Sequence, residues 1–62
     1  MPKDPVMLLS YVNTQLRDNF SSLDELAASN AVSPEEICEK IGTVGYVYDR
    51  EQNRFVPAQT AG

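Results

Sequence analysis

The residue types that usually perform catalysis are scarce in this sequence, and those present have unfavourable neighbours. There is no histidine, the side chain that most often transfers protons near neutral pH, and there is a single cysteine, Cys38. A nucleophilic thiolate needs a positively charged setting, whereas Cys38 lies between Glu35 and Glu39 in the sequence. We therefore interpret Cys38 as a small apolar residue of the core or its edge.

Two groups of acidic residues have spacings that resemble known sites, but neither group is complete. Glu35, Glu36 and Glu39 could be read as paired catalytic acids, yet they open a predicted helix, where the helix dipole already favours carboxylates. Polar residues alternate over 49–53 as in a calcium-binding loop, but the remaining ligands and the required glycine are absent. We expect no catalytic residue, no cofactor and no metal site.

Three arginines, Arg17, Arg50 and Arg54, are the candidates for contacts with nucleic acid. A nucleic-acid surface concentrates cationic side chains near the phosphates, whereas these three are dispersed along the chain unless a dimer gathers six of them. The aromatic residues between positions 46 and 55 resemble a stacking platform for a single strand, which needs a positive groove beside it. Because that groove is missing, we expect the aromatic rings to pack the hairpin against the first helix.

Asn13 lies in the middle of a predicted helix, where asparagine is unfavourable because its side chain competes for main-chain hydrogen bonds. Ser10 and Arg17 share its helical face, so the three residues form a possible interaction patch. The alternative is that Asn13 holds the turn after the second helix, or the hairpin, by a hydrogen bond.

The first of the elements that must position these side chains is a helix over about residues 5–19. Asp4 suits the N-cap and Pro5 the first helical position, where a missing N–H is harmless. Apolar residues then recur at spacings of three and four, which predicts one buried stripe: Leu8, Leu9, Val12, Leu16 and Phe20.

Two shorter helices are predicted over about residues 22–29 and 34–43. Ser22 and Ser33 each suit the N-cap, and each is followed three residues later by a glutamate that completes a capping box. A tight turn joins the two helices in a helix-turn-helix arrangement, with Ala31 where such motifs usually carry glycine.

A small β-hairpin is predicted over about residues 45–56, because two runs rich in aromatic and β-branched residues flank a polar loop. Residues 57–62 have little to bury and are predicted to form a flexible tail. The expected fold is a single α+β domain over residues 1–56, mainly α, whose order of three helices and a hairpin resembles a minimal winged helix-turn-helix.

The composition limits what such a domain can do. A chain of 62 residues buries a thin core, and without disulfides or a metal a partner protein or a second copy is the remaining source of stability. The net charge of −4 lies entirely in residues 21–45, since residues 1–20 and 46–62 are each neutral. This places acidic residues on the helix that would read DNA, so nucleic acid is an unlikely partner. Neither a membrane span nor a signal peptide is indicated, and the single cysteine favours a reducing cytoplasm.

The N-terminal block from Pro2 to Asp18, with its P-K-D-P and L-L-S-x-x-N-x-x-L-R-D segments, resembles a bacterial family of short proteins known only as a domain of unknown function. The stretch 22–26 and the segments 45–49 and 53–56 also resemble that family. The resemblance implies a small cytoplasmic bacterial protein and supplies no activity, cofactor or catalytic residue.

The residues therefore favour a non-enzymatic protein-interaction or regulatory module that binds a protein partner or a second copy of itself. The alternative is a helix-turn-helix transcriptional regulator that binds DNA as a dimer through Arg17, Arg50 and Arg54.

Overall fold

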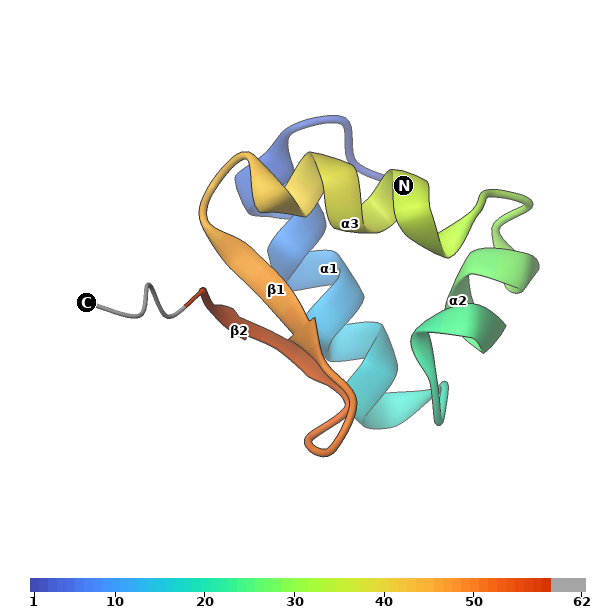
Figure 1. Ribbon diagram of the computed structural model, residues 1–62. Coiled ribbons are helices and arrows are strands. Elements are labelled where there is room, and N and C mark those ends of the chain that lie inside the picture. The colour runs from blue at the N-terminus through green and yellow to red at the C-terminus, as the bar shows by residue number, and fades with distance from the viewer. Residues whose placement is uncertain (59–62) are drawn as a thin grey trace.

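A computed structural model describes residues 1–58 of the chain. The elements are α1 (Pro5–Asp18), α2 (Leu23–Ser29), α3 (Pro34–Gly42), β1 (Tyr46–Asp49) and β2 (Arg54–Pro57) (Figure 1). The two strands form an antiparallel hairpin, with β2 packed against α1 and β1 against α3. The predicted α+β architecture, three helices followed by a C-terminal hairpin, is confirmed.

The first helix begins where the sequence predicts, because Asp4 caps it. The carboxylate Oδ1 of Asp4 accepts hydrogen bonds from the main-chain N–H of Val6 at 2.8 Å and of Met7 at 3.3 Å. Pro5 occupies the first helical position, where its missing N–H leaves nothing unpaired. The helix ends at Asp18, one residue before the predicted end.

The two shorter helices have the predicted serine N-caps, but among the described residues neither glutamate side chain returns a hydrogen bond to the serine N–H that would complete the predicted capping box. The hydroxyls of Ser22 and Ser33 each accept the main-chain N–H of the glutamate three residues later, both at 3.2 Å. In the turn between the helices, Ala31 has a φ of 56°, in the left-handed region. Without a glycine at this position the turn carries a conformation that costs about 1–2 kcal/mol.

The hairpin follows α3 after a short turn. Gly45 has a φ of 82°, which brings the chain out of the turn and into β1 without a steric penalty. Tyr48 then lies directly opposite Phe55 in the strand pair, and their ring centroids are 5.5 Å apart.

The pairing continues past the predicted end of the hairpin. The main-chain N–H of Ala58 donates to the carbonyl oxygen of Gly45 at 2.8 Å, and Pro57 already belongs to β2. Positions 57 and 58 are thus part of the hairpin and not of the predicted tail, while the rest of that tail, 59–62, lies outside the described residues.

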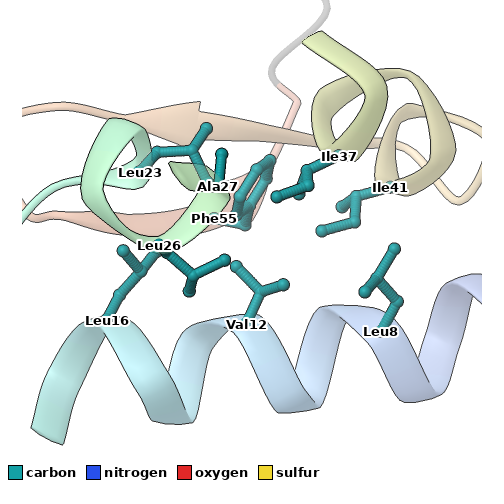
Figure 2. Packing of buried hydrophobic residues seen from close by; sticks show 9 residues of the cluster. All are labelled: Leu8, Val12, Leu16, Leu23, Leu26, Ala27, Ile37, Ile41 and Phe55. Atoms are coloured by element: carbon teal, nitrogen blue, oxygen red, sulfur yellow. The ribbon is translucent and has the colours of Figure 1, made fainter. Parts of the chain in front are cut away.

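The core is one apolar cluster to which all three helices and β2 contribute. Figure 2 shows the side chains of α1 facing those of α2 and α3, with the ring of Phe55 between them. Phe55 is fully buried and is the largest side chain of the cluster, so the hairpin is anchored by a residue of the core itself. The buried residues are Leu8, Val12, Leu16, Leu23, Leu26, Ala27, Ile37, Ile41 and Phe55.

Candidate functional site

Asn13 joins the middle of α1 to β2. Its side-chain Nδ2 donates to the carbonyl oxygen of Phe55 at 3.2 Å, and its Oδ1 accepts the N–H of the same residue at 2.7 Å. A carboxamide that gives one donor and one acceptor to a single strand residue takes the place of a neighbouring strand. Asn13 therefore holds the hairpin, as one of the two sequence interpretations predicted.

A second asparagine fixes the hairpin loop to the C-terminal end of α1. Asn53 has a φ of 52°, which places its side chain toward the helix, and its Nδ2 donates to the carbonyl oxygens of Leu16 and Phe20, both at 3.1 Å. Its Oδ1 accepts the hydroxyl of Tyr48 at 2.6 Å. Because both side-chain atoms of Asn53 are engaged, this residue is not free to act as a ligand in the loop.

The hydroxyl of Tyr48 extends the hydrogen-bond network of Asn53 to α2. It accepts the main-chain N–H of Leu23 at 3.3 Å, one of the N–H groups at the start of that helix which have no partner within it. From the sequence, the ring of Tyr48 is expected only to pack the hairpin, and Asn53 is considered only within an incomplete calcium-like loop, so the hydrogen bonds of both side chains are not predicted. Their only sequence signal is an asparagine in a loop, a residue type that tolerates positive φ, and the partners are 25 to 37 positions away.

A groove of about 500 Å³ lies between α1 and the hairpin loop, beside these contacts. It contains two of the three arginines that were candidates for nucleic-acid contacts, Arg17 and Arg54. Arg50 instead borders a separate hollow of about 390 Å³ near the start of α2. The groove is lined by Asn13, Thr14, Leu16, Arg17, Gln52, Asn53 and Arg54.

The positive charge in the groove is partly compensated. The guanidinium of Arg17 forms a salt bridge with Asp18 at 2.9 Å, which raises the pKa of Arg17 and lowers that of Asp18. Arg54 lies opposite Asp49 across the hairpin. Each arginine of the groove thus has a carboxylate close by, and the pair falls short of a basic patch.

The proposed interaction patch is only partly assembled. Asn13 and Arg17 both line the groove, whereas Ser10 is exposed on α1 and is not among the groove's lining residues. Of the three, Asn13 is occupied by the main chain of Phe55. The surface that remains available to a partner is that of Arg17 and Ser10.

The acidic residues of α2 and α3 lie on the solvent-exposed surface of these two helices. All are exposed, and those of α3 include its first turn, where a DNA-reading helix would approach the phosphates. We call this surface the acidic side; it consists of Asp24, Glu25, Glu35, Glu36 and Glu39.

Cys38 lies half-buried on α3, close to the carboxylate of Glu35. Burial and the nearby carboxylate of Glu35 raise the pKa of the Cys38 thiol, which holds it in the unreactive protonated form. Among residues 1–58, no cluster of three or more cysteine and acidic side chains is arranged to hold a metal ion. Over the same residues, no helix has the length and apolar character needed to cross a membrane.

The fold and its polar contacts define a small α+β domain in which two asparagines and a tyrosine attach a hairpin to a three-helix core. Residues 2–55 match the family described as Domain of unknown function (DUF4250), and the chain belongs to that family. Neither a curated protein nor a solved structure matches the chain. The family resemblance predicted from the N-terminal block is therefore confirmed.

Proposed function

We propose that this chain is a non-enzymatic protein-interaction or regulatory module that binds a positively charged surface of a protein partner through its acidic side. The observation that carries the proposal is the set of exposed carboxylates on α2 and α3 that form no salt bridge. Within residues 1–58 the one salt bridge joins Arg17 to Asp18, so none of the five acids of the acidic side is paired with a cation.

The use of the other polar groups supports a binding role without catalysis. Asn13, Asn53 and Tyr48 are hydrogen-bonded to the main chain of neighbouring elements. The Cys38 thiol has a raised pKa and two glutamates beside it in the sequence. The side chains best suited to chemistry thus hold the fold together, and the acidic side is left facing solvent.

The arrangement of charge also suits a partner protein. Opposite charges across an interface speed encounter and select the correct partner, an effect that weakens as salt is added. The helix dipole also favours negative charge at the start of α3, where Glu35 and Glu36 lie in the first turn. We therefore expect binding to depend strongly on ionic strength.

Affinity capture with matched variants tests this proposal. The immobilised chain is exposed to lysate of its source cells, and captured proteins are compared for the wild type, the triple variant E35Q/E36Q/E39Q and the control E51Q. Glu51 is an exposed acid in the hairpin loop and does not belong to α2 or α3. We expect a protein that is retained by wild type and by E51Q and lost with the triple variant.

Two outcomes would overturn the proposal. One is a well-folded wild-type chain that captures nothing at low salt. The other is a partner retained equally by all three forms, which would place its binding surface elsewhere.

DNA binding is the second candidate, and one observation favours it. Arg17 and Arg54, far apart in the sequence, line the same groove, and the order of three helices and a hairpin is that of a winged helix-turn-helix. The acidic side opposes this function, because Glu35, Glu36 and Glu39 would face the phosphates if α3 entered the major groove.

A mobility-shift titration separates the two candidates. A DNA-binding chain would shift duplex DNA at low salt, lose affinity steeply as salt rises and lose it again in R17A/R54A. The interaction proposal expects no shift of the DNA even at low salt.

The protein is further proposed to act in the cytoplasm, because a single cysteine suits a reducing compartment.

A further inference from the structure

The two edges of the hairpin differ in their main-chain hydrogen bonding, and the difference can be read from two contacts. The N–H of Ala58 donates to the carbonyl oxygen of Gly45 at 2.8 Å, so the carbonyl of Gly45, directly before β1, points toward β2, while its N–H donates to Gly42 in the preceding turn. Phe55 directs both of its polar groups away from β1, toward Asn13. Because hydrogen-bonded and non-hydrogen-bonded pairs alternate in an antiparallel ladder, Tyr46 and Tyr48 direct theirs away from β2.

The outer edge of β2 is closed. At that edge the N–H and C=O of Phe55 both point away from β1. Both groups are hydrogen-bonded to the side chain of Asn13. The next outward position is Pro57, which has no N–H to donate. No further strand can be added at this edge without displacing α1.

The outer edge of β1 is open. Among residues 1–58, the main-chain N–H and C=O groups of Tyr46 and Tyr48 form no hydrogen bond with another element. Beside them Val47 leaves half of its surface, 50%, in solvent. An open edge with an exposed valine is a template for another strand.

We propose that this edge pairs with the same edge of a second copy of the chain, so that the two hairpins form one continuous antiparallel sheet. The proposal concerns a different surface from the acidic side, and neither depends on the other. The pairing is centred on Val47, which lies opposite Val47 of the second copy. Tyr46 then lies opposite Tyr48 of the second copy, and both tyrosines of both copies use their free main-chain groups.

The sequence around this centre favours a second copy as the occupant. The pairing sets Asp49 opposite Gly45 of the second copy, and Arg50 opposite Val44, so no two like charges face each other. On the outer face, Val47 already pairs with Val56 within one chain. The dimer extends this pair into a continuous row of four valines, whose contacts with one another reduce the exposed apolar surface of β1.

Sedimentation equilibrium over about 10 µM to about 1 mM tests the proposal, since a short strand pair makes a small and weak interface. We expect the apparent mass to rise from 6.9 kDa toward twice that value. The variant Val47→Lys places two lysines opposite each other at the centre of the pairing and is expected to weaken the dimer at least about tenfold. Val6→Lys is the matched control, because Val6 is also an exposed valine, 62% against 50% for Val47, and lies on α1.

A second variant guards against an effect of the lysine on the fold. Chemical synthesis with an N-methyl group on the main-chain nitrogen of Tyr48 removes one donor of the open edge and leaves every side chain unchanged. We expect this chain to keep its circular dichroism spectrum and to be monomeric where wild type and Val6→Lys dimerise. A wild type that stays monomeric throughout, or a dimer that survives both the lysine and the N-methyl group, would overturn the proposal.

Discussion

Asn13 uses both polar atoms of its side chain on the main chain of Phe55, and this explains an asparagine in the middle of a helix. The cost of a poor helix former is offset by closing the edge of a strand that would otherwise leave a donor and an acceptor unpaired. Spacing alone places Asn13, Ser10 and Arg17 on one face but does not say which of them faces the hairpin. Identifying Asn13 as the residue that faces the hairpin required the position of Phe55 in β2, 42 residues away in the sequence.

We predict that Asn13→Ala lowers the free energy of unfolding by about 2–3 kcal/mol, because it leaves two part-buried main-chain groups of Phe55 without partners. Ser10→Ala, an exposed change on the same helix, should alter it by less than about 0.5 kcal/mol. Urea denaturation followed by circular dichroism measures both. Equal stability of the two variants would contradict the role assigned to Asn13.

Ala31 provides a second test at the residue scale. Its φ of 56° is unfavourable for alanine and free for glycine, so Ala31→Gly should stabilise the chain by about 0.5–1 kcal/mol after the entropy of glycine is deducted. Ala28→Gly is the matched control, because Ala28 is exposed within α2. There the same change should destabilise by about 1 kcal/mol. Thermal unfolding should show shifts of opposite sign, and a loss of stability in Ala31→Gly would refute the argument from strain.

At the scale of elements, the helices could be predicted to within a residue because their signals are local. Asp4, Ser22 and Ser33 cap the helices that follow them through contacts only two or three residues away. The attachment of the hairpin could not be predicted in the same way. Tyr48 and Asn53 act on α1 and α2 through hydrogen bonds that exist only once the chain has folded.

We predict that Tyr48→Phe lowers the free energy of unfolding by about 1–1.5 kcal/mol, because it removes the hydroxyl that links Asn53 to the start of α2. Tyr46→Phe is the control, since the Tyr46 hydroxyl makes no hydrogen bond within residues 1–58 and its loss should be nearly neutral. Hydrogen exchange gives a second readout: the Leu23 amide should exchange faster in Tyr48→Phe alone. Unchanged exchange there would exclude the tyrosine as a link to α2.

At the scale of the whole molecule, nine residues are buried among the described positions 1–58, so the core is thin and the stability of the domain is small and sensitive to single changes. The polar residues that attach the hairpin are therefore needed by the fold. The surface divides into the acidic side on α2 and α3, the arginine-lined groove and the open edge of β1. The sum of charges in each segment of the sequence predicts that the acids gather in residues 21–45. It does not predict which edge of the hairpin is open.

The carboxylates also set how the whole molecule responds to acid. Hydrogen bonds from Gln52 lower the pKa of Asp49, and Arg17 lowers that of Asp18. A group whose pKa is lower in the folded state stabilises the protein above its unfolded pKa of about 3.9, and this contribution is lost as the pH falls through the folded pKa. We predict that stability declines below about pH 4 and that the decline is shallower in Asp49→Asn. Melting temperatures between about pH 2 and pH 6 measure this, with E51Q as control; identical acid profiles for Asp49→Asn and wild type would contradict it.

The central claim is that the chain's polar chemistry holds its hairpin in place while its outward carboxylates bind a partner. The most direct measurement is the amount of captured protein, determined by quantitative mass spectrometry, for E35Q/E36Q/E39Q relative to E51Q. The account predicts a specific partner whose capture falls at least about tenfold in the triple variant, since that variant changes only exposed carboxylates of the acidic side. A ratio near one for every captured protein would contradict it.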